Sequence, residues 1–290
     1  MSLGPSPSPR RSLVMAALAT VFVAGVSWWA HRQLRDPGPS RSLIDLLQEV
    51  ETAPMAPGAS QRQAPKPPPQ AAWRSPLARQ CDGDRALAKR LRQKLVTYRR
   101  NAITLNIHPS NYGERFRRDA YGNRLDPTPR LVVLHETVYG IGSAINTFLT
   151  RHDADEQQVS YHTLIGLDGT IVPVLDPQKR AFGAGYSGFN GAWAVTKPSI
   201  GGSVNNFALH LSLETPLDGE NDAPGHSGYS QAQYDSLAVV LADWMERFPI
   251  PAEHITTHRY VDLGSERADP RSFAWSELGK RMAALGLLCR

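Results

Sequence analysis

Two short segments with the patterns of buried β-strands constrain the fold of this chain most strongly. Residues 131–134 (LVVL) are fully apolar, as in a strand that is covered on both faces. Residues 207–214 (FALHLSLE) alternate, so that Phe207 and the leucines point to one face while His210 and Glu214 share the other. The chain is therefore expected to build a sheet with a buried interior.

Helical periodicity surrounds these strands. In residues 84–98, leucines recur every three to four positions, and residues 231–248 show the same spacing behind Ser230, which is a suitable N-cap. A further helix carrying Phe148 is expected after the first strand, and a last one over residues 276–288. The helices are therefore interspersed with the strands along the chain.

A hairpin is predicted between the two strands. Residues 161–167 and 170–175 are apolar segments that flank Asp168-Gly169, a dipeptide that favours a tight turn between antiparallel strands. Helices mixed with strands and one hairpin indicate an α+β fold, a mixed β-sheet flanked by helices.

The first 80 residues differ in character from the rest. Residues 1–12 form a polar tail, and residues 13–30 are apolar, uncharged and about long enough to span a bilayer. We expect an uncleaved transmembrane signal anchor there, with a cleaved signal peptide as the alternative. Residues 31–80 are rich in Pro, Ser, Gln and Ala and are expected to be a flexible linker. The folded domain is then residues 81–290.

The positive charge lies in this N-terminal arm. The chain has 32 Lys/Arg and 27 Asp/Glu, of which nine and four lie in residues 1–80, which leaves 23 of each in the domain. A nucleic-acid-binding domain should concentrate basic residues on one face. A neutral domain therefore argues against a nucleic-acid partner.

The two cysteines, Cys81 and Cys289, lie at opposite ends of the expected domain. Their spacing matches no zinc or redox motif. Two separate thiols and one disulfide that ties the ends of an exported domain are both compatible with the sequence.

Two histidines and one aspartate, residue types that bind metals, lie at the ends of expected strands or in loops. His135 ends the first strand, and His258 and Asp269 come late in the chain, the latter followed by Pro270. Two imidazoles and one carboxylate form a ligand set for catalytic zinc, with a fourth position open for water. Because the chain has nine histidines, spacing alone leaves other ligand sets open.

Five stretches in order resemble the zinc-dependent N-acetylmuramoyl-L-alanine amidases, a superfamily that includes phage-lysozyme-type amidases and peptidoglycan recognition proteins. The resemblance extends from about residue 110 to 275. Its stretches are LVVLHET (131–137), VSYHTLIGLDG (159–169), SVNNF (203–207), QAQY (231–234), and TH (257–258) followed by RADP (267–270).

The resemblance implies roles for particular residues. It implies a Zn²⁺ ion bound by His135, His258 and Asp269 at one rim of the sheet. Tyr161 would lie beside the metal and stabilise an oxyanion or orient water. Arg267 would act as a fixed positive charge, since arginine does not readily lose its proton.

Several positions depart from the family's pattern. Ser212 stands where many members carry a glutamate that acts as general base, and Glu214, on the same face, is the candidate substitute. His210 replaces a usual glycine and is a candidate acid/base group, a substrate contact or a structural histidine. Gly183 replaces the histidine of a usual Trp-His-Ala-Gly stretch. The segment from His258 to Asp269 is one residue longer than usual.

We therefore expect a zinc amidase of the cell envelope, periplasmic or extracytoplasmic and held in the inner membrane by residues 13–30. Its substrate would be peptidoglycan, cut between N-acetylmuramic acid and L-alanine, with Glu214 or His210 passing a proton to the leaving amine. A peptidoglycan-binding module without catalysis is the main alternative. A zinc hydrolase for a different amide is the third.

Overall fold

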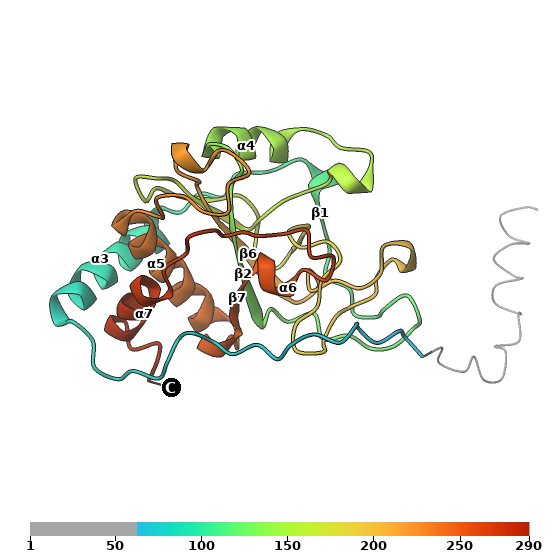
Figure 1. Cartoon of the computed structure of the whole chain (residues 1–290), viewed down its shortest axis with the longest axis horizontal. Helices are drawn as coiled ribbons and strands as arrows, with labels where there is room; N and C mark the ends of the chain where they lie inside the picture. The colour runs from blue at the N-terminus through green and yellow to red at the C-terminus, as the bar shows by residue number, and fades with distance from the viewer. Residues whose placement is uncertain (1–62, 290) are drawn as a thin grey trace, which may run out of the picture. The chain divides into compact units, whose positions relative to one another are not determined.

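A five-stranded mixed sheet forms the centre of the computed structural model, which describes residues 63–289 (Figure 1). The strand order is β4-β3-β6-β2-β7, and only the β3–β4 hairpin is antiparallel. The strands are β2 (Leu131–Glu136), β3 (Thr163–Ile165), β4 (Ile171–Pro173), β6 (Ala208–Leu213) and β7 (Ile255–Thr257). The predicted mixed sheet and its hairpin are confirmed.

Helices account for most of the remaining regular structure. They are α3 (Arg85–Asn101), α4 (Ile141–Leu149), α5 (Gln231–Arg247), α6 (His258–Val261) and α7 (Trp275–Ala284). A two-stranded antiparallel ribbon joins β1 (Tyr112–Gly113) to β5 (Arg180–Ala181). Short 3₁₀ helices lie at Pro109–Asn111, Asp155–Gln157, Pro198–Ile200, Leu217–Gly219 and Ala252–His254.

Capping fixes where the two longest helices begin. The Asp84 carboxylate accepts a hydrogen bond from the Leu87 N–H, and Ser230 and Gln233 form a reciprocal capping box at the start of α5. The predicted cap at Ser230 is thus confirmed. The last helix ends at Ala284, earlier than its apolar pattern suggested, and a turn carries the remaining leucines into the core.

The sheet has two unlike faces. Helices α3, α5 and α7 pack together on one side, where Leu134, Leu209 and Leu211 meet the apolar side of α5 (Figure 1). On the other side Val133 and Ala208 pack against irregular segments. Phe207 belongs to this second cluster, contrary to the predicted alternation, because β6 begins only after it.

His135, His210 and Ser212 alternate with these leucines and lie on the face away from the helices. In the parallel register of β2 and β6, His135 pairs with Ser212, and Leu134 pairs with Thr257 of β7 on the other side. His258 follows β7 directly. Since carboxyl ends of parallel strands meet at one edge, this register brings His135 and His258 together.

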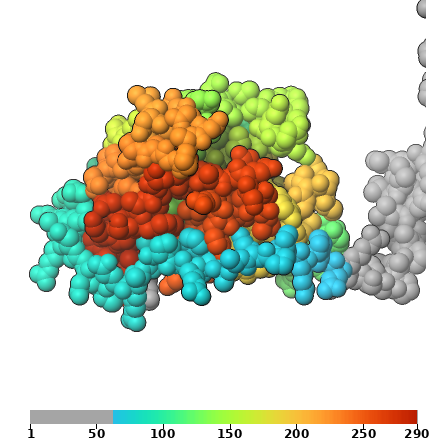
Figure 2. Space-filling model, viewed as in Figure 1, coloured from blue at the N-terminus to red at the C-terminus, as the bar shows by residue number. Residues whose placement is uncertain are grey.

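The part of the expected linker that the structure describes packs on the domain. Residues 63–80 run along its surface as an extended strap (Figures 1 and 2). The Trp73 indole N–H donates to the Glu253 carbonyl oxygen (3.0 Å), and its ring lies against Tyr260 (centroids 4.5 Å apart). Leu77 is buried in the main core. The prediction of a flexible linker up to residue 80 is therefore wrong for this part.

The expected tail (1–12), anchor (13–30) and first part of the linker (31–62) lie outside the described residues. Across residues 63–289, no helix has both the length and the apolar character needed to cross a membrane.

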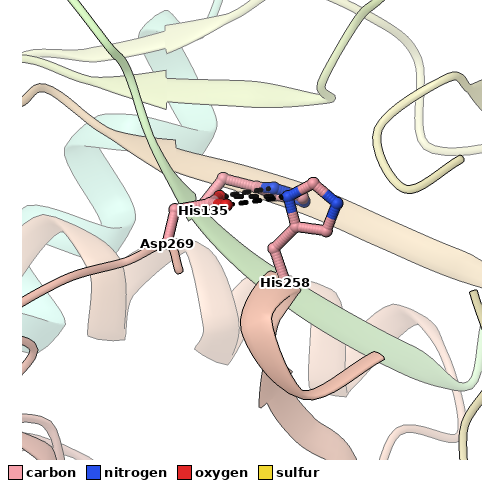
Figure 3. A group of neighbouring side chains, drawn as sticks. All are labelled: His135, His258 and Asp269. Atoms are coloured by element: carbon pink, nitrogen blue, oxygen red, sulfur yellow. Dashed lines mark hydrogen bonds and ion pairs between the residues drawn. The ribbon is translucent and has the colours of Figure 1, made fainter. Parts of the chain in front are cut away.

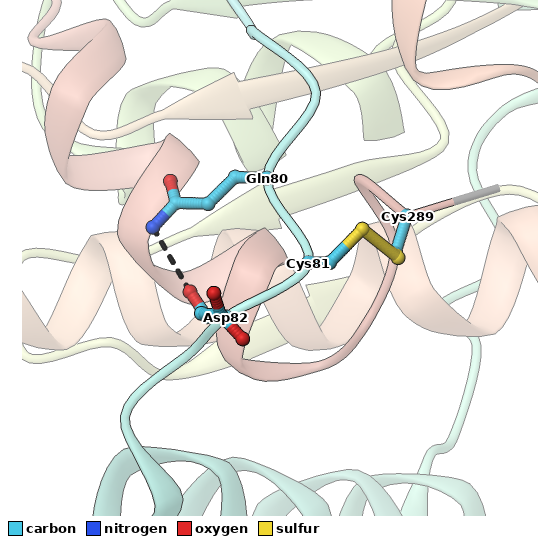
Figure 4. Close-up of a disulfide and its surroundings, with 4 residues drawn as sticks. All are labelled: Gln80, Cys81, Asp82 and Cys289. Carbon is cyan, nitrogen blue, oxygen red and sulfur yellow. Dashed lines mark hydrogen bonds between the residues drawn. A yellow bond between two sulfur atoms is a disulfide. The ribbon is translucent and has the colours of Figure 1, made fainter.

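A disulfide between Cys81 and Cys289 joins the two ends of the domain (Figure 4). It closes a sequence separation of 208 residues, with Cα atoms 4.7 Å apart, and this settles the question that the sequence left open. Next to it, the Gln80 N–H donates to the Leu288 carbonyl oxygen (3.2 Å). The strap is thereby fixed to the turn after α7.

Removing the disulfide should lower the free energy of unfolding by about 2–5 kcal/mol, because the cross-link restricts the unfolded chain. The measurement is urea unfolding of the wild-type protein and of the Cys81→Ser/Cys289→Ser variant, each with and without reductant. Reductant should destabilise only the wild-type protein. Equal midpoints for all four samples would contradict a closed disulfide.

The strap should contribute measurably to stability. Trp73→Ala removes the ring from Tyr260 and is expected to cost about 2 kcal/mol, since the site is only half-buried. Arg74→Ala, at the exposed neighbouring position, is the matched control and should change stability by less than about 0.5 kcal/mol. If urea unfolding gives the two variants the same stability, the segment behaves as a linker.

Candidate active site

His135, His258 and Asp269 converge into one cluster (Figure 3). Asp269 Oδ2 lies 3.2 Å from His135 Nδ1, and Asp269 Oδ1 lies 2.9 Å from His258 Nδ1. The three ligand atoms lie within 4.8 Å of one another. The structure therefore brings together the three residues that the resemblance implied as metal ligands.

Both histidines owe their places to the sheet, whereas a folded loop places the aspartate. The Asp262 carboxylate accepts hydrogen bonds from the N–H groups of Gly264, Glu266 and Arg267. The Arg259 N–H then donates to the carbonyl oxygen of Asp269 (2.9 Å), which closes the loop on α6. The extra residue in this segment is thus accommodated inside an ordered turn.

The cluster suits a divalent cation. Burial alone would raise the pKa of Asp269, but hydrogen bonds from His135 and His258 lower it well below the usual range of a carboxyl. Burial, together with the charges of His258 and Arg267, lowers the pKa of His135 to about 4, although Asp269 opposes this shift. An ionised carboxylate beside a neutral imidazole is the donor chemistry that zinc prefers.

Tyr161 and Arg267 both lie near the cluster. The Tyr161 ring stacks on His135 with centroids 4.3 Å apart, and Phe148 supports its edge. Burial and then the negative charge of Asp269 raise the pKa of Tyr161, so the phenol keeps its proton. Arg267 is exposed, and its charge acts on both His135 and Tyr161.

His210 has a different environment from the one expected for an acid/base group. Its side chain is fully buried, and its Nδ1 lies 3.0 Å from Nε2 of His135. The ring therefore contacts the side of His135 that faces away from Asp269. This position contradicts a direct role in proton transfer to substrate and a direct substrate contact.

Glu214 holds two loops in place. Its Oε1 accepts a hydrogen bond from the N–H of Ile141, at the start of α4, and its Oε2 accepts one from Leu167 in the hairpin turn. Glu214 lies one residue beyond the end of β6. Its carboxylate is thus turned to these two loops.

A buried carboxylate that the sequence did not single out organises the same edge of the sheet. Glu136 accepts hydrogen bonds from Tyr229, His226 and the backbone and side chain of Arg271. Arg271 in turn donates to carbonyl oxygens of residues 219–223. The one sequence signal was an acidic residue directly after His135 at the end of a buried strand, where a carboxylate requires partners.

Comparisons with known proteins identify the family of this chain. Residues 125–272 match the family model described as N-acetylmuramoyl-L-alanine amidase. The 1,6-anhydro-N-acetylmuramyl-L-alanine amidase AmpD of Citrobacter freundii is 32% identical over 121 residues, which cover 41% of this chain and 54% of that protein. AmpD of Escherichia coli K12 is 31% identical over the same length, covering 41% and 56%. The chain spans about half the length of these curated relatives.

Among solved structures, the selenomethionine derivative of AmpD is 24% identical with a TM-score of 0.45, covering 61% of this chain and 93% of that one. The complex of AmpDh3 from Pseudomonas aeruginosa with anhydromuramic pentapeptide is 20% identical with a TM-score of 0.39, covering 53% and 59%. Since the family model covers half of the sequence, the chain belongs to the N-acetylmuramoyl-L-alanine amidase family.

Proposed function

We propose that this protein is a zinc-dependent amidase that hydrolyses the bond between N-acetylmuramic acid and L-alanine in peptidoglycan. The observation that carries the proposal is the convergence of His135, His258 and Asp269 at the sheet edge. Family membership supports the bond and the substrate class. The names of the AmpD relatives specify the same kind of amide in a muramyl compound.

The three clustered residues would hold the zinc ion. When bound, zinc polarises a carbonyl group and lowers the pKa of water, which is the chemistry that amide hydrolysis needs. The protein contributes an ionised Asp269 and a neutral His135, so neither residue has to lose a side-chain proton at neutral pH for the ion to bind.

Tyr161 and Arg267 are suited to stabilise the negative charge that develops on the substrate oxygen. The phenol remains protonated beside His135 and can therefore donate a hydrogen bond. Arg267 supplies a permanent positive charge at the exposed side of the cluster. With Glu214 and His210 engaged elsewhere, Tyr161 is the protonated side chain that we assign to the reacting carbonyl.

The location outside the cytoplasm belongs to the same proposal. Disulfides persist in oxidising compartments, and Cys81 and Cys289 form one here. The peptidoglycan layer lies in such a compartment. Residues 13–30 are expected to anchor the chain in the inner membrane and to keep the domain near this substrate.

The full-length protein should contain one equivalent of zinc and release stem peptides that begin with L-alanine from peptidoglycan. Mass spectrometry of the products and metal analysis, with and without a chelator, measure both. Asp269→Ala should lose the zinc and the release. Cleavage at a different bond would show another amide specificity, and retained peptidoglycan binding without release would identify a binding module.

Tyr161→Phe should lower kcat by about 100-fold, because it removes one donor to the developing oxyanion. Its zinc content should not change, since the phenol is not one of the three ligands. Tyr139→Phe changes an exposed tyrosine in the turn after β2 and serves as the matched control. Unchanged kcat in Tyr161→Phe would remove the phenol from the mechanism.

A further inference from the structure

His210 makes the one contact that the structure describes for the second ring nitrogen of His135. His135 Nδ1 faces Asp269, and its Nε2 lies 3.0 Å from His210 Nδ1. Both side chains are fully buried. Metal-binding histidines usually donate this second N–H to a carboxylate, a backbone carbonyl or water, and here an imidazole takes that place.

The backbone of His210 is held in position by His162, the residue before β3. The His210 N–H donates to Nδ1 of His162 (2.9 Å), and the His162 N–H donates to the carbonyl oxygen of His210 (2.8 Å). The two rings lie nearly parallel, with centroids 5.9 Å apart. His162 therefore serves a buried hydrogen-bonding role.

We propose that His210 is the positioning residue of the metal ligand His135, whose Nε2–H donates to His210 Nδ1 when a metal occupies Nδ1. A neutral imidazole that gives the lone pair of Nδ1 to a metal carries its proton on Nε2. His210 Nδ1 is then the acceptor that selects this tautomer and keeps the His135 ring turned toward His258 and Asp269. The inference rests on the zinc site proposed above.

Gly183 provides the space that this arrangement needs. A Cβ atom at position 183 would lie 2.5 Å from both Cγ and Nδ1 of His210, which is too close for any side chain. The two departures at these positions, histidine for glycine at 210 and glycine for histidine at 183, therefore fit each other. The imidazole belongs to β6, and the segment that faces it has room for the ring because Gly183 has no side chain.

A direct catalytic role fits the geometry less well. His210 Nε2 is buried and has no hydrogen-bond partner among residues 63–289. A group that passes protons to substrate needs a path of hydrogen bonds to it. His210 reaches the cluster only through His135, so it acts on the metal ligand.

The test compares zinc affinity in full-length variants by competition with a chromogenic chelator. His210→Leu keeps a similar volume but has no acceptor, and it should weaken zinc binding by about 10- to 100-fold. His210→Asn retains an acceptor oxygen near the position of Nδ1 and should stay within about threefold of wild type. Gly183→Ala should weaken binding as His210→Leu does, because its methyl group displaces the ring. Equal affinity in His210→Leu and wild type would overturn the proposal.

A second measurement does not depend on the variants folding. In the zinc-loaded wild-type protein, ¹⁵N NMR of the imidazoles should show the His135 proton on Nε2 and a scalar coupling across the hydrogen bond to His210 Nδ1. A proton on His210 Nδ1 instead would overturn the inference while leaving the zinc site intact. If the wild-type protein binds no zinc, the proposed function fails and this inference fails with it.

Discussion

The parallel register of β2 with β6 and β7 is the constraint on which the site depends. It pairs His135 with Ser212 and ends β7 immediately before His258. A shift by one residue would turn His135 toward the helix layer and bring Leu134 to the site. The apolar side chains that face α5 therefore set the register and, through it, the positions of His135 and His258.

Burying a carboxylate at this edge has an electrostatic cost that its neighbours offset. Asp269 keeps its charge because two imidazole nitrogens lie within 3.2 Å of Oδ2. Glu136, at the same edge of the sheet, keeps a buried position through Arg271, Tyr229 and His226. Glu136 is thus buried and Asp269 half-buried in one region, each with its own set of partners, and this separation leaves Asp269 available for the proposed metal.

The sequence predicted the strands, the hairpin, the long helices and the grouping of the ligand residues. It failed where a local pattern was overruled by tertiary contacts. Proline-rich composition suggested a linker. Trp73 packs on Tyr260 and Leu77 is buried in the main core, and overall composition does not reveal such contacts of single residues. Alternation placed Glu214 on the polar face, yet β6 ends at Leu213, so the next side chain is free to turn toward the loops. The alternation of side chains between two faces predicts their direction only for residues inside the strand.

The site has an accessible side and a buried side, and this division orders its chemistry. Tyr161 is half-buried and Arg267 is exposed, and we propose that both stabilise charge that develops on the substrate carbonyl. His210 and Ser212 lie beneath His135, where the side chains are fully buried. A glutamate at position 212 would add a charge to this buried side beside the ligand. In this chain a serine and a histidine take those places, so no carboxylate on the buried side would compete for the proposed metal, and His210 is left to orient His135 as we propose.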